Sequence, residues 1–158
     1  MDKNESPKAT GMSDLTGKVL KVRHATEADM AFIEETMRKH QFDAKNLDYG
    51  DFVVATENNE IVGLGSLRKT GGIYEVGCLV VLEEKKEQGI GQLIARHLVD
   101  HAPVNKIYAM TDRVDYFKKM GFVEISDKSK EYLATLALVC DAGKKIKKVL
   151  MSHEKTGK

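Results

Sequence analysis

A short glycine-containing segment has the residue types of an anion-binding turn. The segment is Lys86-Glu87-Gln88-Gly89-Ile90-Gly91. It follows an apolar run and precedes a helical pattern. Glycine lets the main chain approach a ligand closely, and the first N–H groups of a helix point outward with no acceptor of their own. Such a turn can bind a pyrophosphate, but a tight strand-to-helix turn without a ligand explains the two glycines equally well. It is no Walker loop, because no Gly-Lys-Ser/Thr follows, and no dinucleotide fingerprint, because the third glycine is missing.

The cysteines and histidines form no metal or disulfide pattern. His97 and His101 share a helix face at i and i+4, but two ligands fall short of the set that a zinc site needs. Cys78 lies in an apolar strand, which favours a small buried hydrophobe over a covalent nucleophile. Cys140 has no partner in view, so two cysteines indicate a reducing compartment rather than a disulfide framework. We expect no metal.

The hydrophobic periodicity predicts the elements that position these residues. Residues 1–17 are polar and are expected to form a disordered tail, followed by a single domain over residues 18–158. Thr26 is the expected N-cap of a helix that ends near His40 and turns Met30, Ile33 and Met37 toward the core. The expected strands are residues 18–23, 52–56, 61–67, 73–82, 106–110, 122–125 and 146–152. Later helices are expected from Gly89 to before Pro103, over 116–120 and over 131–139. A meander followed by a crossover helix predicts an α/β fold with a mixed sheet.

Composition narrows the class of partner. The chain has 25 basic and 24 acidic residues and a formal net charge of +1, which argues against a nucleic-acid partner. The apolar runs are too short to cross a membrane, and residues 1–18 lack the apolar segment of a signal peptide. We therefore expect a cytoplasmic protein with no membrane partner.

Three segments together resemble the GNAT superfamily of N-acetyltransferases. The run from Glu75 through Gly91 to Leu93 is similar to the acetyl-CoA-binding motif, in which Arg/Gln-x-x-Gly-x-Gly/Ala follows a strand; Lys86 takes the Arg/Gln place. Residues 116–122 are similar to the Phe-Tyr-Glu-Lys-Leu-Gly-Phe segment of the family. Residues 22–26 resemble the first strand and helix cap of the family. The resemblance covers about residues 18–126.

The resemblance implies a mostly antiparallel sheet that is splayed in the middle, with helices on both faces. The pantetheine of acetyl-CoA would lie between the strands 73–82 and 106–110, where main-chain groups of Leu79 and Val81 would pair with it. The amides of residues 88–91 would hold the pyrophosphate, and a backbone N–H of residues 80–81 would face the oxyanion. The cofactor-binding residues implied are Leu79, Val80, Val81, Lys86, Glu87, Gln88, Gly89, Ile90, Gly91 and Phe117.

Direct transfer of an acetyl group to a neutral primary amine is the reaction that the resemblance implies. Glu75 is the candidate general base, directly or through water; a solvent-facing residue or a partner of a lysine is the plainer alternative. Phe117 occupies the place of the tyrosine that usually acts as acid in the family. Tyr116 stands one residue earlier, which rotates its side chain by about 100° on a helix. The acid is therefore Tyr116, Tyr108, a water or no group at all.

The acceptor is open on sequence alone. The run 75–81, Phe117 and Thr111 also resemble N-acetylglutamate synthases, which points to a small amino acid such as glutamate, although the chain has no room for the amino-acid-kinase domain that many of them carry. Among three arginines that could bind a carboxylate bidentately, Arg68 is the best candidate, and a surface ion pair is its plainer role. The other two are Arg23 and Arg113.

Alternatives of other classes stay open. Asp43, Asp48 and Asp51 could instead bind a cationic amine of a polyamine or of a protein lysine. The absence of a tyrosine at position 117 leaves room for a non-catalytic acetyl-CoA-binding module. A homodimer is an expectation that rests on the family resemblance alone.

Overall fold

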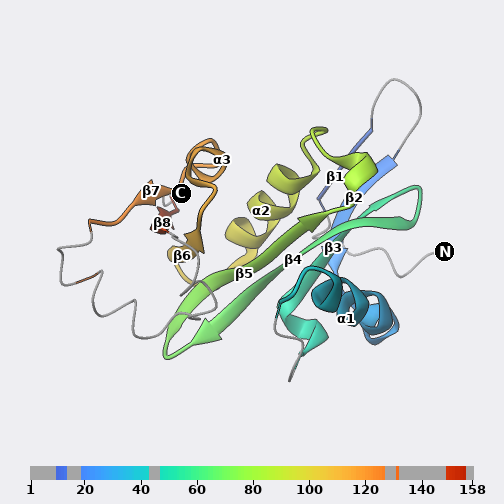
Figure 1. The fold of residues 1–158 in the computed structure, drawn as a ribbon, viewed down its shortest axis with the longest axis horizontal. Helices are drawn as coiled ribbons and strands as arrows, with labels where there is room; N and C mark the ends of the chain where they lie inside the picture. Colours follow the sequence, from blue (N-terminus) through green and yellow to red (C-terminus); the bar gives the residue numbers. More distant parts are fainter. Residues whose placement is uncertain (1–9, 14–18, 43–46, 127–130, 132–148, 156–158) are drawn as a thin grey trace. The chain divides into compact units, whose positions relative to one another are not determined.

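The computed structural model describes residues 10–13, 19–42, 47–126, 131 and 149–155 (Figure 1). The strands are β1 (Thr10–Ser13), β2 (Val19–His24), β3 (Phe52–Glu57), β4 (Glu60–Thr70), β5 (Ile73–Val81), β6 (Lys106–Thr111), β7 (Val123–Glu124) and β8 (Val149–Glu154). The α-helices are α1 (Met30–Lys39), α2 (Ile90–His101) and α3 (Val114–Lys118). Short 3-10 turns cover Glu27–Asp29, Tyr49–Asp51 and Glu83–Lys85.

The strands form a mixed sheet in the order β1-β2-β3-β4-β5-β6-β8-β7. Successive strands from β1 to β4 pair antiparallel, and β5 pairs parallel with β6. The chain divides into two compact units. The first contains Met1–Ser66 and Cys78–His97, and the second contains Leu67–Gly77 and Leu98–Lys158. The α/β fold and the mostly antiparallel sheet are thus confirmed.

The first unit is an antiparallel meander with a helix on each face. Asn58 and Asn59 have positive φ angles of 52° and 72°, as expected for the tight turn between β3 and β4. On the face of the sheet that α1 covers, residues of α1 and of the strands form an apolar cluster. It includes Ile33, Met37, Phe52, Val54, Leu64, Cys78 and Val80. On the opposite face of β4, a Cβ on Gly63 would lie 3.0 Å from the Ile94 Cδ1 of α2. Side chains alternate along a strand, so α1 and α2 cover opposite faces here (Figure 1).

The second unit is built around β6. Strand β8 pairs antiparallel with β6 from Lys106↔Glu154 to Thr111↔Val149. Strand β5 pairs parallel with β6 over residues 74–76 and 107–109. The pairing thus involves only the first part of β5, which agrees with the splayed sheet that the resemblance implies.

The structure departs from the expected elements near the chain ends. Residues 10–13 fall within the predicted tail, yet they form β1 and pair antiparallel with β2. Main-chain hydrogen bonds at a sheet edge need no apolar pattern, so hydropathy did not reveal this strand. Helix α3 begins at Val114, two residues before the predicted start, and the strand predicted over 122–125 is reduced to β7. The helix predicted over 131–139 lies outside the described residues except for Glu131.

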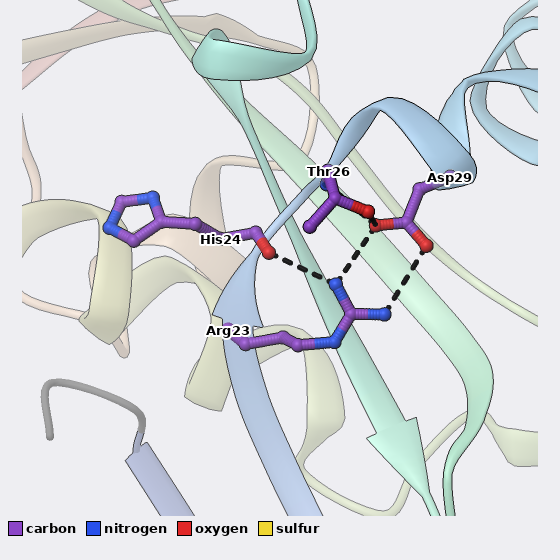
Figure 2. Close-up of polar contacts among 4 residues, drawn as sticks. All are labelled: Arg23, His24, Thr26 and Asp29. Atoms are coloured by element: carbon purple, nitrogen blue, oxygen red, sulfur yellow. Dashed lines mark hydrogen bonds and ion pairs between the residues drawn. The ribbon is translucent and has the colours of Figure 1, made fainter. Parts of the chain in front are cut away.

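A buried carboxylate joins the end of β2 to the start of the first helix (Figure 2). The Arg23 guanidinium donates to Asp29 through Nη1 at 2.9 Å and Nη2 at 3.2 Å. The same carboxylate accepts the Thr26 main-chain N–H at 2.7 Å. Hydrogen bonds from Arg23 are the main cause that holds the pKa of Asp29 below its ordinary value, against the opposing effect of burial. The predicted N-cap Thr26 thus caps the 3-10 turn Glu27–Asp29 that leads into α1, and Asp29 is the N-cap of α1 itself. Arg23 is engaged inside the protein and is no free carboxylate clamp.

We predict that Asp29→Asn lowers the free energy of unfolding by about 1 kcal/mol at neutral pH, since it removes the ion pair and weakens the cap. The folded pKa lies below the unfolded one, so this stability is present above the unfolded pKa and is lost as pH falls through the folded pKa. Urea unfolding of both proteins should therefore converge from about pH 4 downward. Glu35→Gln on the exposed face of α1 is the control. A difference that stays constant with pH would contradict the assignment.

Candidate active site

The glycine-containing segment follows β5 and is anchored at both ends within the first unit. Leu82 N–H donates to the Val62 carbonyl at 2.9 Å, which ties the end of β5 to β4. Lys85 is ion-paired with Glu57 at 2.5 Å. At the other end, Leu93 N–H donates to the Gly89 carbonyl at 3.0 Å and closes the first turn of α2. The segment between these anchors is therefore held in place by two main-chain hydrogen bonds and one side-chain ion pair.

The backbone of this segment has the conformation of an anion cradle. Glu87 and Gly89 both have positive φ angles, 67° and 82°. A Cβ built on Gly89 would meet no atom within 4 Å, so the space in front of this residue is open. Helix geometry leaves the N–H groups of Ile90 and Gly91 without an intrahelical acceptor. Open space at Gly89, N–H groups without an intrahelical acceptor and the positive end of the α2 dipole together suit a phosphate group.

The side chains around the glycine-containing segment are exposed or belong to the core. Lys86 is exposed and lies 3.2 Å from Glu83, itself 87% exposed. A solvent-exposed pair of this kind is weak, so the Lys86 ammonium can turn toward an anion. Val80 packs into the α1-side core, while Leu79 and Val81 are half-buried.

Glu75 is buried in the second unit, with 4% of its surface exposed. It pairs in register with Tyr108 of β6, whose hydroxyl donates to Glu131 at 3.0 Å. The structure therefore excludes the solvent-facing role for Glu75. Glu75 is thus a buried carboxyl in the row beside Tyr108.

Tyr116 and Phe117 occupy different surroundings in α3. Phe117 is buried and packs edge-on against Phe122, with the ring centroids 5.2 Å apart. Tyr116 is half-buried, and the Arg113 guanidinium lies 4.2 Å from its ring centroid. Burial raises the pKa of Tyr116, and the charge of Arg113 opposes the rise. Tyr116 thus keeps its proton at neutral pH, and Arg113 is a stacking partner of the ring.

Arg68 is the remaining arginine of the three carboxylate candidates. Its Nε is buried with no hydrogen-bond partner. Across residues 10–13, 19–42, 47–126, 131 and 149–155, no ion pair joins it to a carboxylate, in contrast to the plainer role expected from sequence. A buried guanidinium nitrogen without an acceptor is costly unless a ligand supplies one.

The remaining candidate groups are the Cys78 thiol and side chains that could bind a metal. The Cys78 thiol is buried and lies 3.6 Å from the Ser66 hydroxyl, as expected for a small core residue. Within the described ranges, no group of three or more His, Cys, Asp or Glu side chains could hold a metal ion. The same part of the chain contains no helix that is both long and apolar enough to cross a membrane.

Lys106 and Glu131 could not be identified from the sequence, because a pair 25 positions apart leaves no local spacing signal.

A family model described as the acetyltransferase (GNAT) domain matches residues 19–133. The chain belongs to the GNAT acetyltransferase family. An uncharacterized N-acetyltransferase of Chlorobaculum tepidum is 34% identical over 86 residues, which are 52% of this chain and 54% of that protein. The chain thus matches about half the length of this curated relative.

Solved structures support the GNAT fold. N-acetylglutamate synthase from Neisseria gonorrhoeae, in complex with coenzyme A and N-acetyl-glutamate, matches with a TM-score of 0.66, 16% identity and coverage of 87% of this chain and 35% of that one. Rv2747 from Mycobacterium tuberculosis, in complex with CoA, matches with a TM-score of 0.69, 19% identity and coverage of 84% of this chain and 98% of that one. At these identities the likeness establishes the fold alone.

We predict that Gly89→Val weakens coenzyme A binding by at least about tenfold, because a branched side chain disfavours the positive φ and fills the open space. Isothermal titration calorimetry measures the affinity. Gly72→Val is the matched control, since Gly72 also has a positive φ (89°) and open space around its Cβ, but lies in the β4–β5 turn. Equal affinities for Gly89→Val and wild type would contradict the pyrophosphate site.

Proposed function

We propose that this domain is an N-acetyltransferase that moves the acetyl group of acetyl-CoA to the primary amine of a small acceptor. The observation that carries the proposal is the main-chain cradle at residues 88–91, on a chain of the GNAT family. Acetyl-CoA supplies the activated acyl group, and the protein binds, orients and moves protons. The cradle amides would hold the pyrophosphate, and main-chain groups of residues 79–81 would align the pantetheine.

Two side chains are proposed for proton transfer. Glu75 would take the proton of the attacking amine, directly or through a water, because only the neutral amine has a lone pair for the carbonyl carbon. Tyr116 would return a proton to the departing thiolate. Its raised pKa favours the protonated phenol at neutral pH, which a donor requires.

We propose an acceptor that carries a carboxylate, with glutamate as the first candidate. Arg68 supports this choice, since its buried Nε has no acceptor among the residues that the structure describes. Arg23 and Arg113 are used by Asp29 and Tyr116. A cationic acceptor remains the alternative, since Asp48 is exposed and accepts one hydrogen bond, from the Gly50 N–H at 2.9 Å. Asp43, which belonged to the same acidic set, lies outside the described residues.

The assembly and the compartment belong to the same proposal. A cytoplasmic homodimer is consistent with the near-neutral charge and with the family resemblance. Sedimentation of the purified protein measures the assembly.

Thiol release from acetyl-CoA, measured against amino acids, polyamines and short peptides, tests the function. Release that depends on glutamate or another carboxylate-bearing amine supports the proposal. Release only with polyamines or peptides would reject the acceptor class but keep the reaction. Binding of acetyl-CoA without release for any acceptor would favour the non-catalytic module, to which Phe117 in place of a tyrosine would then belong.

We predict that Glu75→Gln lowers turnover by about a hundredfold near neutral pH. The loss should shrink at high pH, where more of the amine is already neutral and needs no base. The pH dependence of kcat/KM for both proteins measures this difference. Glu124→Gln, on exposed β7, is the control. An equal loss at all pH values would rule out a base role.

We predict that Arg68→Lys raises the acceptor KM by roughly tenfold and leaves coenzyme A affinity unchanged. Lysine keeps the charge but lacks the planar fork that pairs with a carboxylate bidentately. Steady-state kinetics with glutamate and with its amide analogue shows whether the change in KM depends on the acceptor carboxylate. Arg96→Lys, exposed on α2, is the control. A normal KM for the Arg68 variant would place the acceptor carboxylate elsewhere.

A further inference from the structure

Three buried polar side chains lie in one row across the sheet of the second unit. Glu75 of β5 pairs in register with Tyr108 of β6, and Tyr108 pairs with Ser152 of β8. Their exposed fractions are 4%, 9% and 6%. Residues paired in register on neighbouring strands point to the same face, so the Tyr108 ring lies beside the Glu75 side chain.

The far end of the Tyr108 ring is held by an ion pair. The Tyr108 hydroxyl donates to Glu131 Oε2 at 3.0 Å, and the Lys106 ammonium binds the same oxygen at 2.5 Å. Lys106 Nζ also lies 5.8 Å from the Tyr108 ring centroid. The three residues form a closed network that fixes the phenol at its oxygen and at its face.

The network is electrically balanced at neutral pH. The hydrogen bond from Lys106 is the main cause that lowers the pKa of Glu131, with a further contribution from Tyr108. The hydrogen bond to Glu131 is the main cause that raises the pKa of Lys106. Both residues therefore stay charged, and their opposite charges offset each other.

Other charged groups near this row belong to the neighbouring strands. Lys106 pairs in register with Glu154 of β8, which is exposed. Strand β4 contributes Arg68 and the exposed Lys69 to the same unit. These groups are present in every variant described below, so they set a constant background.

We propose that Lys106 and Glu131 are positioning residues for Glu75: their balanced ion pair, joined to the row through Tyr108, sets the pH at which the Glu75 carboxyl accepts a proton. The inference rests on the proposed base role of Glu75. Neither Lys106 nor Glu131 touches the reacting atoms in this scheme. They act through the electrostatic field and through the fixed Tyr108 ring.

Opposite changes of charge should produce opposite shifts. Lys106→Met leaves Glu131 uncompensated, and a nearby negative charge disfavours the Glu75 carboxylate. The acid limb of kcat/KM should then move to higher pH, by about half a unit. Glu131→Gln leaves Lys106 uncompensated and should move the limb to lower pH by a similar amount. The double variant should return close to the wild-type position.

The matched controls are Lys118→Met and Glu124→Gln. This second ion pair has its atoms 3.3 Å apart and belongs to the same unit, but both side chains are about half exposed. The controls change the net charge by the same amounts and should leave the limb in place. A limb position does not depend on the fraction of active protein, so partial misfolding of a variant cannot imitate the shift.

A titration of the Glu75 carboxyl by carbon-13 NMR, assigned with Glu75→Gln, gives the same readout without turnover. Opposite shifts in the two variants support the proposal even if no acceptor is found. Shifts of the same sign, or shifts equal to those of the controls, overturn it. If the wild-type protein is active and the acid limb of kcat/KM stays at the same pH in both variants, the proposal is also overturned, and the acetyltransferase function is kept. If the wild-type protein transfers no acetyl group while the two variants still show opposite NMR shifts, the proposed function is rejected and the positioning role is kept.

Discussion

The placement of the first turn of α2 is the constraint on which the proposed cofactor site depends. Ile90 and Ile94 are almost fully buried, and Gly63 of β4 lets this helix approach closely because it lacks a Cβ. Closing the first turn at Gly89 leaves outward-pointing amides next to open space. The site is therefore a product of packing beneath it, and the bound group would contact main-chain atoms.

A site made of main-chain atoms imposes few demands on side-chain identity. It requires a glycine where φ is positive and the ligand approaches, and it requires core residues that hold the helix. Lys86 in place of an arginine or glutamine is compatible with this arrangement, since its side chain is exposed and weakly paired.

Charged side chains follow a different rule, because a buried charge is costly without a partner. In the first unit, Arg23 and Thr26 supply hydrogen bonds to the Asp29 carboxylate, which has a structural role. Glu131 is likewise satisfied by Lys106 and Tyr108. The buried Nε of Arg68 has no such acceptor, which is why it is the stronger candidate for a ligand contact.

The sequence by itself determined the elements whose signals are local. Apolar alternation located β2, apolar runs between turn residues located β3 to β6, the pair Asn58-Asn59 located a turn, and Thr26 with Asp29 located a helix start. The glycines of the cradle and the GNAT resemblance came from contiguous residues as well. Only the tertiary structure decided that β1 adds to the sheet edge, that Arg23 is already engaged, and that Glu131 reaches Tyr108. Those outcomes depend on partners brought together by folding, and a hydrogen bond between distant positions imposes no periodicity that a sequence could display.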